Sequence, residues 1–253
     1  MPAPRDALEA VTHADPYPYY RSLRKTQPLF FDAGLRLWVA SSHAAVDAAL
    51  RHPGLRVRPP DEAVPKALQG GAAGQVFAQL VRMTDGDFHA VHKPGVELAA
   101  RRWQLADAAR AAEGAVQDLV PRLAVNDFLT ALPVHTMARL LGVPASEREP
   151  TCRWVAQFTQ GIASGAGAQA VARAHQAAEA LMVQGQALGL PPAQARSMGF
   201  GAGAHGCPGA EIAIEKVAAC AGWMRASGRF DGYFGRPAGF RPLSNARIPV
   251  FEN

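Results

Sequence analysis

Long apolar runs are missing from this chain of 253 residues. No stretch approaches the roughly 20 consecutive apolar residues that a membrane-spanning helix needs. The first ten residues, MPAPRDALEA, also lack the apolar core that is typical of a signal peptide. The sequence therefore predicts a cytoplasmic protein that does not span a membrane.

Cysteine is scarce, with three residues in the chain, Cys152, Cys207 and Cys220, and no C-x-x-C pair. An odd number without close pairs argues against a disulfide framework and against a structural zinc site. The formal net charge is only +5, and no block of five Lys or Arg residues occurs. Nucleic acid is therefore not a predicted partner, whereas the mild positive charge suits an acidic ligand or an acidic protein.

Hydrophobic periodicity predicts a mainly α fold with a small β portion from residues 28–40 and 240–251. The turn residues Asp32–Gly34 precede a strand at 35–40, and Ser41 and Ser42 are expected N-caps of the next helix. Residues 55–82 are rich in Pro and Gly and are expected to be mostly loop. Helices are expected at 15–25, 44–50, 97–120, 127–141, twice within 151–185, and at 210–225. We expect one domain over residues 1–253.

The segment from 200 to 209 reads F-G-A-G-A-H-G-C-P-G. Its spaced set consists of Phe200, Gly201, Gly203, His205, Cys207 and Gly209. Glycines allow a tight loop whose N–H groups point at a sulfur, and such a loop suits a thiolate that binds heme iron. The helix expected after Pro208 places its positive end beside the thiolate and should lower the pKa of Cys207. The alternative is a buried free cysteine in a Gly-rich turn.

This loop resembles the heme-ligand signature of the cytochrome P-450 superfamily at every restricted position. The resemblance implies heme b as cofactor, Cys207 as the axial ligand of the iron, and His205 as a contact of a heme propionate. The segments DPYPYYRSLR, PLFFDAGLRLWVASSHAAVDAAL, NDFLTALPVHTMARLLGVP and PLSNARIPVF are similar to other parts of the family.

Residues 83–94, MTDGDFHAVHKP, resemble the start of the family's helix that crosses the propionates. The family pattern His-x-x-x-Arg becomes His89 and Lys93 here, which keeps the charge but changes the donor geometry. The pair is expected to bind propionates by charge-assisted hydrogen bonds. A solvated helix start is the alternative, and His92 is a competing candidate.

The resemblance covers residues 14–185 and 197–253, and the family's central part is missing, with an apparent deletion near 186–196. No Asp-Thr or Glu-Thr pair and no Glu-x-x-Arg motif occurs. The family uses the first to deliver protons and the second to brace the cysteine loop. We therefore expect an open distal heme face and apolar surfaces that rearrangement or a homodimer must cover.

The resemblance implies an oxidoreductase that acts on a small organic substrate, monooxygenase-like or driven by peroxide. No nucleotide-binding loop is present, so reducing electrons would come from a separate redox partner protein. One alternative is a non-catalytic helper that stabilises a partner enzyme. Another is a heme sensor or carrier, in which His89 or His92 would ligate the iron.

Overall fold

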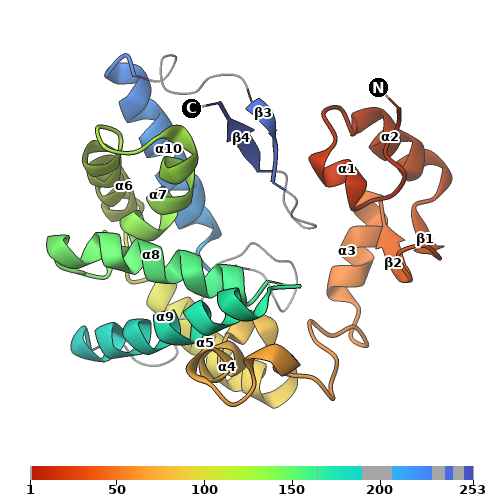
Figure 1. The fold of residues 1–253 in the computed structure, drawn as a ribbon, viewed down its shortest axis with the longest axis horizontal. Coiled ribbons are helices and arrows are strands. Elements are labelled where there is room, and N and C mark those ends of the chain that lie inside the picture. Colours follow the sequence, from red (N-terminus) through yellow and green to blue (C-terminus); the bar gives the residue numbers. More distant parts are fainter. Residues whose placement is uncertain (1, 164, 190–206, 230–236, 242–247, 253) are drawn as a thin grey trace. The chain divides into compact units, whose positions relative to one another are not determined.

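The computed structural model describes residues 2–163, 165–189, 207–229, 237–241 and 248–252. These residues form two compact units, one from 2–55 with 237–241 and 248–252, the other from 56–189 with 207–229. Most of the described residues lie in helices, and the strands form two small antiparallel sheets (Figure 1). The predicted fold class, mainly α with a small β portion, is therefore confirmed.

The first unit combines the N-terminal segment with the last strands. Its helices are α1 (Glu9–Thr12), α2 (Tyr17–Thr26) and α3 (His43–Arg51), and its strands are β1 (Leu29–Asp32), β2 (Leu37–Ala40), β3 (Pro237–Phe240) and β4 (Pro249–Phe251). Strand β1 pairs with β2 from Leu29 opposite Ala40 to Asp32 opposite Leu37, and β3 pairs with β4. Both expected β regions are therefore present.

Local side chains fix the ends of these elements. The Asp32 carboxylate accepts the Leu35 N–H at 2.9 Å, which closes the turn predicted between the first two strands. The Ser42 hydroxyl accepts the Ala45 N–H at 3.2 Å and caps α3, as its position before an apolar helix predicted. Asp32 thus fixes the turn of the hairpin, and Ser42 fixes the start of α3.

The second unit is a helical assembly. It contains the short 3-10 helices η1 (Lys66–Leu68) and η2 (Val81–Met83) and the helices α4 (Ala72–Ala78), α5 (Gly86–Ala100), α6 (Leu105–Leu119), α7 (Val125–Leu140), α8 (Ala145–Gly161), α9 (Ala168–Ala187) and α10 (Ala210–Ala226). The main packed pairs are α8 with α9, and α6 with both α7 and α10. Helix α6 therefore connects the C-terminal helix to the rest of the unit.

Small side chains allow these helices to approach closely. A Cβ at Gly161 of α8 would meet the Ala174 side chain of α9 and would lie 2.6 Å from the carbonyl oxygen of Ala170. Helix α6 buries Ala108, Ala112 and Ala115 completely. A core of fully or nearly buried apolar residues joins α4, α8 and α9, formed by Leu68, Ala73, Phe77, Leu80, Phe158, Ala174, Ala177 and Ala178.

The single helix expected over 97–120 is wrong at its start. Helix α5 ends at Ala100, and α6 begins at Leu105 with a capping box in which Gln104 and Asp107 bind each other's backbone N–H groups. Leu98, which lies within the expected range, belongs to α5 and is 69% exposed. The apolar spacing continues across the break between α5 and α6. A capping box consists of polar side chains, so a pattern of apolar residues does not reveal it.

The loop expected over 55–82 contains a helix, α4. Its first turn is held from outside, since Nδ1 of His175 on α9 accepts the Ala73 N–H at 3.1 Å. The ring of His175 packs so closely on Gly71 that a Cβ there would collide with it. Tertiary contacts thus stabilise a short helix that its Gly-rich sequence disfavours.

Candidate functional site

Cys207 lies immediately before α10, two residues ahead of the N-cap Gly209. Its carbonyl oxygen accepts the Ala210 N–H at 3.3 Å, and the Gly209 carbonyl oxygen accepts the Ala213 N–H at 2.9 Å. The Cys207 side chain is half-buried. A Cβ on Gly209 would lie 3.8 Å from the Cys207 sulfur, and the Gly209 φ of −98° is open to any residue. Gly209 thus leaves space beside the sulfur rather than relieving backbone strain.

The other two cysteines are occupied in helix packing. The Cys220 S–H on α10 donates to the Ala112 carbonyl oxygen of α6 at 3.8 Å, and the Cys152 S–H on α8 donates to the Ala131 carbonyl oxygen of α7 at 3.7 Å. Burial raises the pKa of each thiol to about 11, so both are protonated near neutral pH. Cys152 and Cys220 are therefore engaged in helix packing, and Cys207 as the thiolate ligand stays a prediction.

A buried lysine, Lys216, lies near two of the cysteines, Cys220 and Cys207. Lys216 on α10 is only 7% exposed and shares a helix face with Ile212 and Cys220, one turn away on either side. Burial lowers the pKa of Lys216, and the neighbouring Cys220 and Cys207 thiols partly oppose that shift. The charge of Lys216 is thus best tolerated when a nearby sulfur is a thiolate.

His89 and Lys93 lie four residues apart on α5 and so share one face of that helix. The His89 side chain is buried and Lys93 is half-buried, which disagrees with a fully solvated helix start. The competing His92 packs its ring against Phe88, with 4.2 Å between ring centroids. The role of His89 and Lys93 toward a propionate stays a prediction.

Part of the predicted site lies outside the described residues, namely Phe200, Gly201, Gly203 and His205. Among the residues that the structure does describe, no three His, Cys, Asp or Glu side chains converge as a metal site. A heme site would not require such a cluster, because a heme would need a single thiolate from the protein. Among the described residues, Cys207, His89 and Lys93 are the ones that would hold heme, and this assignment stays a prediction.

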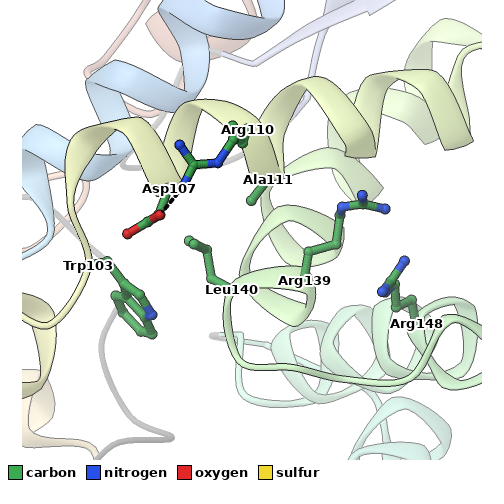
Figure 2. A pocket seen from close by; sticks show the side chains of 7 residues that line it. All are labelled: Trp103, Asp107, Arg110, Ala111, Arg139, Leu140 and Arg148. Carbon is green, nitrogen blue, oxygen red and sulfur yellow. Dashed lines mark hydrogen bonds and ion pairs between the residues drawn. The ribbon is translucent and has the colours of Figure 1, made fainter.

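A polar hollow between three helices was not predicted from the sequence. An open hollow of about 390 Å³ is lined by Trp103, Asp107 and Arg110 near the start of α6, by Arg139 and Leu140 at the end of α7, and by Arg148 of α8 (Figure 2). None of the predicted heme residues in the described part of the chain lines it. The arginines are 9 to 38 residues apart in the sequence, so no motif could have revealed them.

Comparisons with known proteins bear on the fold. No protein-family model matches the sequence, and no curated protein matches it. Among solved structures, the chain is similar to P450BioI in its complex with hexadec-9Z-enoic acid ligated acyl carrier protein, with a TM-score of 0.53 and 16% sequence identity. The match covers 84% of this chain and 59% of that chain. The chain thus has a P450-like fold and spans about three fifths of the length of that neighbour.

None of the described helices has the length and apolar character needed to cross a bilayer.

Proposed function

We propose that this chain is a heme-thiolate protein in which Cys207 is the axial ligand, and that it oxidises a small organic substrate. The observation that carries the proposal is the placement of Cys207. It is the half-buried cysteine before α10 in a chain of P450-like fold, while Cys152 and Cys220 are protonated and engaged in packing. The sequence signature from 200 to 209 supports the same assignment.

Each of these residues has a separate role in the proposal. The Cys207 thiolate would bind the iron, Gly209 leaves room beside the sulfur, and the first turn of α10 directs backbone N–H groups toward the loop. His89, Lys93 and His205 would bind the propionates. A thiolate-bound heme supplies cleavage of an O–O bond and oxygen transfer. Because the acid-Thr pair of the family is absent, peroxide suits this chain better as oxidant than molecular oxygen does.

The test is the reduced carbon-monoxide difference spectrum of the protein expressed with a heme precursor. Wild type should give the red-shifted Soret band of thiolate ligation, and Cys207→Ala should lose it. Cys152→Ala is the matched control, because it removes a half-buried cysteine from another helix and should keep the band. A band that survives in Cys207→Ala, or a nitrogen-ligated spectrum in both proteins, would overturn the proposal.

A homodimer is proposed as well. Ile214 and Val217 lie one turn apart on the outer face of α10 and are 66% and 69% exposed. A second copy of the chain would cover this pair and remove apolar area from water. Analytical ultracentrifugation should show a dimer for wild type and a monomer for Ile214→Asp, whereas a monomeric wild type would contradict the dimer.

A second candidate function is a helper that binds a partner enzyme without using heme. The observation that favours it is that the chain spans 59% of the P450 neighbour, whose own structure holds a bound acyl carrier protein. In that case the protein would purify without heme, and its folded stability would not change when heme is added. A separate redox protein is the partner if the chain is an oxidoreductase, whereas the stabilised enzyme is the partner if the chain is a helper.

A further inference from the structure

The hollow between α6, α7 and α8 has an excess of positive charge. Arg110, Arg139 and Arg148 line it, and Asp107 is the acidic residue in its wall (Figure 2). Arg110 pairs with Asp107 within α6. Arg139 and Arg148 instead share one carboxylate outside the wall, that of Asp118, at 2.7 and 3.7 Å. Two guanidinium groups therefore depend on a single acidic side chain.

Two more basic side chains, His135 and Arg122, lie near Asp118. Nε2 of the buried His135 lies 3.8 Å from Asp118, and Arg122 is close enough to lower the pKa of His135 together with Arg139 and Arg148. Burial is the main cause of that lowered pKa, so His135 is mostly neutral and does not add a full charge. The charge of Asp118 is nevertheless divided among several cations, and a second anion would be favourable here.

The guanidinium groups at this site are partly withdrawn from water. The side chains of Arg139 and Arg148 are 28% and 20% exposed, against 70% for Arg110. Arg139 is fixed further by Gly114, where a Cβ would collide with the guanidinium, and Nε of Arg148 donates to the Val143 carbonyl oxygen at 3.0 Å. Preorganised, partly desolvated arginines bind carboxylate and phosphate oxygens more strongly than mobile surface arginines do.

The same hollow has an apolar side. Trp103 lies at one end of it and Leu140 between Trp103 and Arg139, with Arg148 beyond (Figure 2). An inorganic anion would use only the arginines, whereas the volume of about 390 Å³ leaves space for an organic group. A ring or short chain would pack on the indole of Trp103 while its anionic end meets the guanidinium groups.

We infer that this hollow binds a small organic anion, a phosphate ester or carboxylate, with its charged group on Arg139 and Arg148 and its apolar group on Trp103 and Leu140. The inference does not depend on heme or on Cys207, because none of the predicted heme residues within the described ranges lines the hollow. Ligand binding there would also join α6, α7 and α8, and so would stabilise the folded protein by mass action.

The test is calorimetric titration of the full chain with phenyl phosphate, inorganic phosphate and hexaglutamate at matched ionic strength. Phenyl phosphate should bind one to one and more tightly than inorganic phosphate. Arg148→Gln should weaken phenyl phosphate binding by about tenfold, because a charge-assisted contact is lost. Trp103→Leu should abolish the preference for phenyl phosphate over inorganic phosphate. Arg153→Gln, on the exposed side of α8, is the matched control and should bind like wild type.

Thermal unfolding of each variant shows first that it is folded. Three results would overturn the inference. The first is that phenyl phosphate does not bind saturably to folded wild type, and the second is that Arg153→Gln weakens binding as much as Arg148→Gln does. The third is that hexaglutamate binds through Arg148 and phenyl phosphate does not, which would identify a docking surface for an acidic protein.

Discussion

Arg139 of α7 donates to the carboxylate of Asp118 on α6 at 2.7 Å, and the same carboxylate faces Arg148 of α8 at 3.7 Å. One acidic side chain thus connects three helices that are consecutive in the chain. The connection is tertiary rather than local, since 21 residues separate the hydrogen-bonded pair. It therefore differs from the i,i+4 ion pairs elsewhere on the surface.

Replacing Asp118 should cost more than replacing an equally exposed surface carboxylate. Asp118→Asn should lower the free energy of unfolding by about 1–2 kcal/mol, because Arg139 and Arg148 would lose their counter-charge. Asp47→Asn is the matched control, since Asp47 is also 42% exposed but pairs only with Arg51 one turn away, and it should cost about 0.5 kcal/mol or less. Urea unfolding measures both, and equal losses would contradict the structural role of Asp118.

The three thiols should differ in reactivity. In heme-free protein at pH 8, Cys207 should be alkylated by iodoacetamide well before Cys152 and Cys220. A thiol whose pKa is about 11 is a thiolate in only about one molecule in a thousand at that pH. Peptide mass spectrometry over time gives the order, and added heme should protect Cys207 alone. Labelling of Cys220 as fast as Cys207 would show that the α10–α6 contact does not bury its sulfur.

Two glycines in the α8–α9 pair should respond in opposite directions to alanine. Gly161→Ala should destabilise the fold by about 1–3 kcal/mol, because the new methyl group collides with Ala174 and with the Ala170 backbone of α9. Gly185→Ala meets no atom within 4 Å inside α9 and should stabilise by about 0.5–1 kcal/mol through helix propensity. Chemical denaturation compares them, and a neutral Gly161→Ala would mean that the two helices can separate at no cost.

The sequence predicted what depends on short-range patterns. The Ser42 cap, the turn after Asp32 and the helix after Cys207 all follow from residues within a few positions of each other. Helix α4 was missed because its cap comes from His175, about a hundred residues away. The hollow with Arg110 and Arg148 was missed for the same reason, since only packing of three helices brings these side chains together.

The candidate heme site could be predicted from the sequence only in part. The loop signature predicts Cys207 as the ligand, but only the structure shows that Cys220 and Cys152 are engaged with Ala112 and Ala131 in helix packing. The burial of Lys216 could not be predicted from the sequence either. A lysine on an apolar helix face is ordinarily read as exposed, and its burial depends on how α10 packs against α6.

His135 should make stability depend on pH below neutrality. Burial lowers its pKa from 6.5, so the unfolded chain binds a proton that the folded protein excludes. Stability from this group is therefore complete above about pH 6.5 and is lost as the pH falls toward the lower folded pKa, with a slope of at most about 1.4 kcal/mol per pH unit. The opposing attraction of Asp118 reduces the slope but does not reverse its sign.

The measurement is the free energy of urea unfolding between pH 5 and 8 for wild type, His135→Gln and His43→Gln. The glutamine at 135 cannot titrate, so that variant should lose less stability than wild type between pH 6.5 and 5, whatever its absolute stability is. His43 is exposed and serves as the matched control, which should follow the wild-type curve. If His135→Gln and wild type lose stability in parallel, the proton is taken up by another group, and His135 is accessible to water in the folded protein.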